Sequence, residues 1–306
     1  MTISSNHIET LKKINSLFEN VKDRSWDYNI LITETYFRPE IVELDNFSLV
    51  TSNFCEEHYG INCIYPPIPN NKDYLISDND IEIALEYLKE LNDNNLGGIF
   101  CMPDTMFNTL NKNKFAVYEY CPEYLYDINE QIELAGIKFK SIRRAINQFK
   151  RNEFQIEELN RKKHIEECMV LSEKKPIFEQ GFYDAIDKYD TIKFIDTSTY
   201  GFVVKINNKI VGVSINTSHN NIAYNLVRRV DHNVDGITEF MNLHMIQYYK
   251  SLNPNLLMFN DGDDIEIEGL HFFKTKMKPI SKKHIYEIYK KEIPLESCKK
   301  ECMELN

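Results

Sequence analysis

The sequence lacks the motifs of zinc proteins, membrane-spanning proteins and secreted proteins. Its seven cysteines include no Cys-x-x-Cys pair, and Cys298 and Cys302 have no histidine partner at zinc spacing. We therefore expect no zinc site, and reduced thiols in a reducing compartment. No apolar run approaches the roughly 20 residues that cross a bilayer, and the N-terminus lacks the apolar core of a secretory signal. These absences predict a soluble, cytoplasmic protein without an integral membrane segment.

Motifs for common cofactors are missing as well. The sequence contains no Walker loop, no Rossmann glycine fingerprint and no Gly-x-Ser-x-Gly nucleophile elbow. The formal net charge of −11 argues against a protein that coats nucleic acid, although it leaves room for a local basic patch. We expect no bound cofactor and no DNA partner.

The chain has 306 residues, of which 42% are hydrophobic and 12% aromatic, and this is enough for two domains with packed cores. We predict one domain at 1–150 and a second at 151–306. In the first half, helical spacing and alternation predict helices at 7–22, 79–93 and 104–112, and strands at 29–33, 47–52, 61–65 and 97–102.

The second half has a clearer order of elements. Helices at 161–174 and 180–188 precede three alternating strands, TYGFVVKI, NKIVGVSINTS and NIAYNLVRR, which asparagine-rich hairpin turns connect. The chain then continues with a helix at 236–250, a strand at 255–259, a helix near 265–274 and a strand near 284–289. This order predicts an α+β architecture and resembles the fold of GCN5-related N-acetyltransferases (GNAT).

The acidic run NDGDDIEIEGL, at 260–270, invites a calcium-loop interpretation. An EF-hand loop that starts at Asp261 needs an oxygen ligand at its fifth position and a glycine at its sixth, but these positions hold Ile265 and Glu266. We therefore expect no metal here. The alternative is a helix start, because Asp263 and Glu266 have the spacing of a capping box and acids favour the positive end of a helix dipole.

The segment KFKSIRRAINQFKR, at 138–151, contains six basic residues and no acid. Its apolar residues recur at helical spacing, so one side of the expected helix is strongly basic. One interpretation is a solvated helix face, and the other is a binding patch for phosphate or another polyanion. The residues expected in such a patch are Lys138, Lys140, Arg144, Lys150 and Arg151.

Two motifs together resemble one protein family. The first, GIKFKSIRRAINQFK, departs from the family pattern at Arg144 and Ala145 and matches it at Gly136, Lys138, Phe139, Arg143, Ile146, Asn147, Phe149 and Lys150. The second covers the acidic run. It has Glu266, His271 and Met277 in place of the family's glycine, arginine and tyrosine, and it matches at Asn260, Asp264, Glu268, Gly269, Leu270, Lys274 and Pro279. The chain thus resembles soluble relatives of the C-terminal catalytic domain of bacterial phosphatidylglycerol lysyltransferases.

The resemblance implies two packed GNAT-like domains, each with a mixed, mainly antiparallel sheet and flanking helices. It also implies a likeness to enzymes, Fem-type aminoacyltransferases among them, that move an aminoacyl group from aminoacyl-tRNA to an amine or hydroxyl. The acceptor would be small or lipid-linked. Two alternatives stay open: an N-acyltransferase that uses acyl-CoA or a carrier protein, and a GNAT-like binding protein without catalytic activity.

The loop RRVDHNVDG, at 228–236, bears on the identity of the acyl donor. In a GNAT enzyme the corresponding loop and helix start bind the pyrophosphate of acyl-CoA. Here Asp231 and Asp235 would repel a pyrophosphate. This argues against an acyl-CoA donor and favours an aminoacyl-tRNA whose phosphates contact the basic segment.

Acyl transfer needs a base and a group that stabilises the developing oxyanion. The resemblance points to Asp264 and Glu268 as catalytic or amine-binding residues, and His232 is a further candidate base because histidine titrates near neutral pH. Structural roles compete with these: Asp264 as a helix cap, and Glu268 as an ion-pair partner of Lys274 or Arg143. The expected substrate-binding residues are Arg143, Asn147, Asn242, Asn260 and Lys274.

Overall fold

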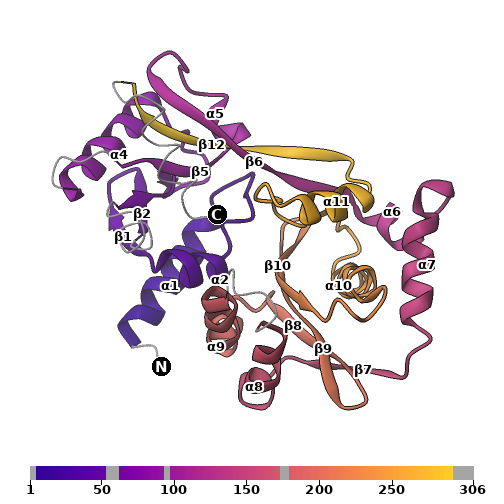
Figure 1. Ribbon diagram of the computed structural model, residues 1–306. Coiled ribbons are helices and arrows are strands. Elements are labelled where there is room, and N and C mark those ends of the chain that lie inside the picture. Colours follow the sequence, from indigo (N-terminus) through magenta and orange to yellow (C-terminus); the bar gives the residue numbers. More distant parts are fainter. Residues whose placement is uncertain (1–4, 53–61, 93–96, 173–178, 292–306) are drawn as a thin grey trace. The chain divides into compact units, whose positions relative to one another are not determined.

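The computed structural model describes residues 5–52, 62–92, 97–172 and 179–291 (Figure 1). These residues form two compact units. The first unit holds the described residues up to Pro122 together with those from Lys283 onward, and the second unit is Glu123–Lys282. The boundary expected at residue 150 lies inside the second unit. The last strand of the described residues returns to the sheet of the first unit, and the order of elements in the sequence does not reveal this return.

The first unit is a mixed sheet with helices. Its strands are β1 (Glu40–Glu43), β2 (Phe47–Ser52), β3 (Cys63–Ile64), β4 (Ile68–Pro69), β5 (Ile99–Pro103) and β12 (Ser281–Lys290). Its helices are α1 (Ser5–Phe18), α2 (Ile30–Ile32), α4 (Asp78–Leu91) and α5 (Asp104–Phe107). The sheet order is β1-β2-β3-β5-β12, with β4 also paired to β2, and only β3 and β5 run parallel.

The strand predicted at 29–33 is wrong. Residues 30–32 form α2, and Thr33–Phe37 form a π-helical turn. Ile30, Leu31 and Ile32 are all buried, and a short run that is buried at every position does not distinguish a strand from a helix.

The helix predicted at 79–93 is confirmed as α4. The Ser77 side chain accepts a hydrogen bond from the backbone N–H of Asp80, and the Asp80 carboxylate accepts one from the backbone N–H of Ser77. This reciprocal capping box fixes the start of the helix.

The second unit continues from β6 (Phe115–Asp127), a strand that begins in the first unit. Its helices are α6 (Ile128–Glu133), α7 (Lys140–Phe149), α8 (Arg161–Ser172), α9 (Glu179–Ile195), α10 (Ile237–Leu252) and α11 (Glu268–Lys276). Its other strands are β7 (Phe154–Glu158), β8 (Tyr200–Ile206), β9 (Lys209–His219), β10 (Ile222–Val230) and β11 (Met258–Asn260). The strand order is β6-β11-β10-β9-β8-β7, and only β10 and β11 are parallel.

The three predicted hairpin strands of this unit are confirmed as β8, β9 and β10. Asparagines with positive φ stand in both turns, at Asn207 and Asn208 and again at Asn220. Asparagine tolerates this left-handed conformation better than most residues do, so the sequence marks both turns clearly.

Helix α10 lies between the sheet and α7 (Figure 1). The buried side chains of α10, Phe240, Met241 and Ile246 among them, point to more than one side of the helix. Such a helix must pack against other elements on more than one face. The sheet covers one side, and the apolar residues of α7 cover another. Each large apolar side chain buried in this way contributes about 1.5–3 kcal/mol.

Strands β10 and β11 pair over only a short stretch. The paired positions are Ile222 with Met258, Ala223 with Phe259, and Tyr224 with Asn260. Beyond them β10 continues along β9, with a bulge between Asn225 and Val227, while the chain after β11 turns away. In α/β sheets, ligands bind beside the carboxyl ends of parallel strands that separate in this way.

Candidate functional site

Three hydrogen-bonded side chains, which we call the histidine trio, stand beyond the end of β11. The Tyr124 hydroxyl, from β6, donates to Asp264 Oδ2 at 2.6 Å, and Nδ1 of His271, on α11, lies 2.8 Å from the same oxygen. The Tyr124 oxygen is 3.0 Å from His271 Nδ1. Tyr124 is fully buried, whereas the side chains of Asp264 and His271 are 10% and 55% exposed. The imidazole therefore stands between a buried carboxylate and solvent.

The Asp264 carboxylate is held in its ionised form. Burial would raise its pKa, but hydrogen bonds from Tyr124, from His271 and from the backbone N–H of Glu266 outweigh burial, so the pKa of Asp264 lies below its usual range. A carboxylate stabilised in this way has a low proton affinity and is a weak base. The hydrogen bonds of Asp264 instead suit a residue that orients the side chains of Tyr124 and His271.

The capping box predicted for Asp263 and Glu266 is wrong. Helix α11 begins only after its cap residue Ile267, which makes no side-chain capping bond. Ile265 and Glu266 have left-handed backbone conformations, which an α-helix does not accommodate. The Asp264 side chain instead accepts a hydrogen bond from the backbone N–H of Glu266 at 3.2 Å and closes a turn before the helix.

Four polar side chains, which we call the buried network, lie where β10 and β11 separate. Asn225 donates to Asp261 Oδ1 at 2.7 Å, and the Arg228 guanidinium lies 3.2 Å from this oxygen and 3.3 Å from Oδ2. Arg228 also donates to the side-chain oxygen of Asn242, on α10. The Asn242 amide nitrogen, Nδ2, is buried and has no hydrogen-bond partner among the described residues. An unpaired buried amide is costly, so this nitrogen is a candidate contact for a substrate oxygen.

Two expected substrate-binding residues, Lys274 and Asn260, bind the protein's own loop after β11. The Lys274 ammonium donates to the backbone carbonyls of Asp261 and Asp263. Burial lowers the pKa of Lys274, while the charges of Asp261, Asp263 and Asp264 oppose this shift. Asn260 donates to Glu123 at 2.6 Å and accepts a backbone N–H two residues further on at 2.8 Å. Both residues therefore fix the shape of the loop that carries Asp264.

Arg143 also binds backbone rather than an acid. Its guanidinium donates to the carbonyl oxygens of Leu134 and Gly136, the latter at 2.8 Å, and so holds the turn before α7. The ion pair considered for Glu268 with Lys274 or Arg143 is therefore not formed. The other sequence-predicted site residues are exposed: Asn147 on α7, His232 in the loop before α10, and Glu268 at the start of α11.

The predicted basic segment is largely the helix α7, with an apolar side in the core and an exposed side that carries cations. Lys138 pairs with Glu130 at 2.8 Å. The remaining four cations are exposed, and none forms an ion pair with any described residue; we call them the basic face: Lys140, Arg144, Lys150 and Arg151. The basic segment thus presents four exposed positive charges without ion pairs to described residues, two on α7 and two directly after it.

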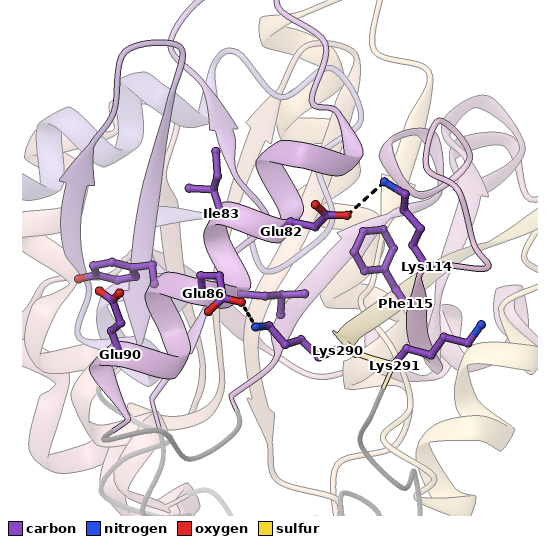
Figure 2. Close-up of a pocket in the computed structure, with 10 residues that line it drawn as sticks. Glu82, Ile83, Glu86, Glu90, Lys114, Phe115, Lys290 and Lys291 are labelled. Carbon is purple, nitrogen blue, oxygen red and sulfur yellow. Dashed lines mark hydrogen bonds and ion pairs between the residues drawn. The ribbon is translucent and has the colours of Figure 1, made fainter.

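An open pocket of about 610 Å³ lies in the first unit, beside α4 (Figure 2). Its carboxylates on α4 face Lys114, which directly precedes β6, and a lysine at the end of β12. Glu82 pairs with Lys114 at 3.1 Å, and Glu86 pairs with Lys290. None of the sequence-predicted site residues lines it. We place the candidate site in the second unit, where a buried carboxylate, a histidine and an unpaired amide occur.

The described part of the chain contains neither a metal-binding cluster nor a membrane-spanning helix. No cluster of three or more histidine, cysteine, aspartate or glutamate side chains there has the arrangement of a metal site. No helix within the described ranges is both long and apolar enough to cross a membrane.

Sequence reasoning missed four residues that the structure brings to this site: Tyr124, Asn225, Arg228 and Asp261. Tyr124 lies 140 positions from its partner Asp264 and belongs to no motif. The signal for the others is weak but present, because Asn225 and Arg228 are polar residues in a mainly apolar strand. A buried amide or guanidinium in a central strand needs polar partners, and this need predicts a polar cluster.

The solved structures similar to this chain include the following three. A conserved protein of unknown function from Bacteroides thetaiotaomicron is 16% identical, with a TM-score of 0.75 over 95% of this chain and 99% of that chain. L-PGS from Bacillus licheniformis is 14% identical, with a TM-score of 0.68 over 96% of each chain. A tandem GNAT protein from the clavulanic acid biosynthesis pathway is 8% identical, with a TM-score of 0.53 over 95% of this chain and 98% of that chain. The fold is therefore α+β, of the tandem GNAT-like kind.

None of the curated proteins matches the sequence. The family described as phosphatidylglycerol lysyltransferase, C-terminal, matches residues 82–289, a range that contains both sequence motifs, the histidine trio and the buried network. This match indicates an acyl or aminoacyl transferase at the level of the family. Because it spans more than half of the sequence, the chain belongs to the phosphatidylglycerol lysyltransferase C-terminal family.

Proposed function

We propose that this protein transfers an aminoacyl group from aminoacyl-tRNA to an amine or hydroxyl of a small or lipid-linked acceptor. The observation that carries the proposal is the exposed basic face of α7, which belongs to the same unit as the histidine trio and the buried network. The donor would bind through its phosphates, and the chemistry would take place where β10 and β11 separate.

The basic face supports a polyanionic donor. In a chain with a formal net charge of −11, four cations without internal ion pairs form a local exception to the overall repulsion of nucleic acid. Lysine and arginine contacts to phosphates position a nucleic acid without reading its sequence. The affinity for tRNA should therefore fall steeply as salt is added.

The start of α10 supports aminoacyl-tRNA over acyl-CoA. Gly236 precedes this helix with φ of 76°, and a Cβ atom there would lie 2.0 Å from the Ala145 carbonyl oxygen, so the backbone of α7 closes on the helix start. Asp235 beside it accepts a hydrogen bond from Gln148 at 2.6 Å. A pyrophosphate at this helix start would meet a carbonyl oxygen and a carboxylate, both of which disfavour an anion.

The buried network offers a donor for the acyl carbonyl. Attack on the ester places negative charge on its carbonyl oxygen, and fixed N–H donors stabilise that charge. Arg228 holds the side-chain oxygen of Asn242, so the Asn242 Nδ2 is oriented and free to donate. Asn242→Asp keeps the size of this side chain but removes the donor, and we expect it to lower kcat by about 100- to 1,000-fold.

Exposed apolar residues near the histidine trio indicate what kind of acceptor the site would take. Ile267, Leu270 and Phe272 are exposed near His271 along the chain, and Phe272 is 71% exposed. Exposed apolar side chains near a site favour a partner with apolar surface. This favours a lipid-linked acceptor over a small, fully polar one.

Binding is tested with a pair of charge-matched variants. K140E/R144E reverses two charges on the basic face, and K162E/K209E reverses two exposed lysines elsewhere in the same unit. In a filter-binding assay with aminoacyl-tRNA, K140E/R144E should lose at least tenfold in affinity while K162E/K209E stays near the wild type. Equal affinity of the two variants would refute the docking role of α7.

Transfer is tested with a tRNA pool charged with radiolabelled amino acids. The acceptors are vesicles of phosphatidylcholine and phosphatidylglycerol, or ethanolamine as a soluble amine. Label in the lipid or in the amine supports the proposal and identifies the acceptor class. Turnover of acetyl-CoA alone would support the acyl-CoA alternative, and no binding or turnover of either donor would support a non-catalytic binding protein.

A further inference from the structure

The histidine trio fixes which nitrogen of His271 carries a proton. Nδ1 faces two oxygens, Asp264 Oδ2 at 2.8 Å and the Tyr124 hydroxyl at 3.0 Å. The Tyr124 proton is directed to Asp264, so the tyrosine oxygen has only a lone pair to offer to the ring. Since an ionised carboxylate is also only an acceptor, Nδ1 must be the N–H of the neutral imidazole.

The other ring nitrogen, Nε2, then carries a lone pair that can accept a proton. His271 Nε2 makes no hydrogen bond with any residue in the described ranges, and the side chain is 55% exposed. A neutral imidazole whose Nδ1–H donates to a fixed carboxylate is oriented as a proton acceptor at Nε2. A substrate can therefore reach Nε2, while Asp264 and Tyr124 fix the ring at Nδ1.

We propose that His271 is the catalytic base of the transfer reaction, with Asp264 and Tyr124 as residues that position its ring. The assignment rests on the function proposed above and gives its chemical step a named base. It also divides the roles of the acidic run, because Asp264 orients the imidazole while the exposed histidine takes the proton.

The step balances without a cofactor. The acceptor's nitrogen or oxygen forms a bond to the ester carbonyl carbon and gives its proton to His271 Nε2. The bond between that carbon and the ribose oxygen of tRNA then breaks, and the departing oxygen takes the proton from the imidazolium. The imidazole returns to its neutral form, and nothing is oxidised or reduced.

The tautomer is tested without any substrate. In protein labelled with ¹⁵N-histidine, a long-range proton–nitrogen correlation spectrum at about pH 8 distinguishes an Nδ1–H ring from an Nε2–H ring. The His271 signal is assigned by its loss in H271Q. We expect the Nδ1–H form in the wild type and a shift toward the Nε2–H form in D264N. An Nε2–H ring in the wild type would overturn the proposal, whatever the protein turns out to transfer.

The role of the base is tested by transfer of label from charged tRNA. H271Q should lower kcat by about 100- to 10,000-fold with little change in KM for aminoacyl-tRNA, because the basic face is intact. Free imidazole should restore part of the activity of H271A, and a merely structural role would not give this rescue. H219Q, at the turn between β9 and β10, serves as the histidine control and should keep its activity.

The outcomes separate this proposal from the function on which it rests. A wild type that transfers nothing refutes the proposed function, while the tautomer still decides whether the base is formed. A wild type that transfers label together with a fully active H271Q overturns the assignment of His271 alone. Loss of activity in H232Q instead of H271Q would move the base to the loop before α10.

Discussion

The sharpest thermodynamic prediction concerns Glu287, a buried acid of β12 in the first unit. Glu287 is 9% exposed and stands at the irregularity where the pairing of β12 with β5 shifts between Tyr286 and Ile288. A bulge turns a side chain toward the interior that regular pairing would direct outward. The Tyr289 hydroxyl donates a hydrogen bond to the Glu287 carboxyl group at 3.0 Å.

The sign and size of the effect follow from the pKa of Glu287. Burial raises this pKa to about 7 from 4.5, and the hydrogen bond from Tyr289 offsets only part of the shift. Below pH 4.5 the acid is protonated in both the folded and the unfolded state. Above that value the unfolded chain loses its proton first, so the free energy of unfolding falls as pH rises toward 7 and then levels off. At 1.36 kcal/mol per pKa unit, the loss is about 3 kcal/mol.

Glu287→Gln removes this titration and is measured by urea unfolding at about pH 4.5 and about pH 8. The only tryptophan of the sequence, Trp26, lies in the first unit, so its fluorescence follows the unit that contains Glu287. We expect the variant to match the wild type at the lower pH and to exceed it by about 3 kcal/mol at the higher pH.

Glu86→Gln is the matched control for this prediction, because Glu86 belongs to the same unit but is exposed and paired with Lys290. Its pKa is lowered by that pair, so its removal should not stabilise the protein at the higher pH. An E287Q variant with the same pH dependence as the wild type would refute the burial argument.

Three further predictions concern the second unit. Gly236→Ala should lower the free energy of unfolding by about 2 kcal/mol or more, because the new Cβ would lie 2.0 Å from the Ala145 carbonyl oxygen. Gly269→Ala is the control and should change thermal stability little, because a Cβ there would have no atom within 4 Å. Tyr124→Phe should cost about 1.5–3 kcal/mol in urea unfolding, since it removes a donor to a charged group, and NMR should show a raised pKa for Asp264. Lys274→Met should cost about 2–3 kcal/mol by leaving the carbonyls of Asp261 and Asp263 without their donor. A Lys274→Met variant of wild-type stability would show that water replaces the ammonium.

Local signals made most elements of the second unit predictable from the sequence. Alternating apolar residues and asparagine turns mark β8, β9 and β10, because the side-chain period of a strand and the left-handed turn are both local properties. The division into units was not predictable in the same way. β12 (Ser281–Lys290) pairs with β5, and no local pattern encodes a partner about 180 positions away.

In the candidate site, too, the local features could be predicted from the sequence and the long-range contacts could not. Motif matching placed Asp264 and His271 in one segment, and α11 then brings the His271 ring back to Asp264 within hydrogen-bond distance. Tyr124 could not be predicted, because its contact with Asp264 depends on the pairing of β6 with β11. The interpretation of Asp263 and Glu266 as a capping box failed because spacing does not reveal the left-handed turn that precedes α11.

Residues that match the family motifs are used mainly inside the fold. Arg143 and Lys274 donate hydrogen bonds to backbone carbonyls, and Asn260 donates to Glu123. These bonds hold two loops in shape. His271, in contrast, departs from the motif and is the exposed member of the trio. Arginine at this position could not accept a proton, because a guanidinium has no free lone pair. A histidine here can take a proton that an arginine could not, and because His271 is exposed, chemical differences between chains of this family should be sought at exposed positions of this kind.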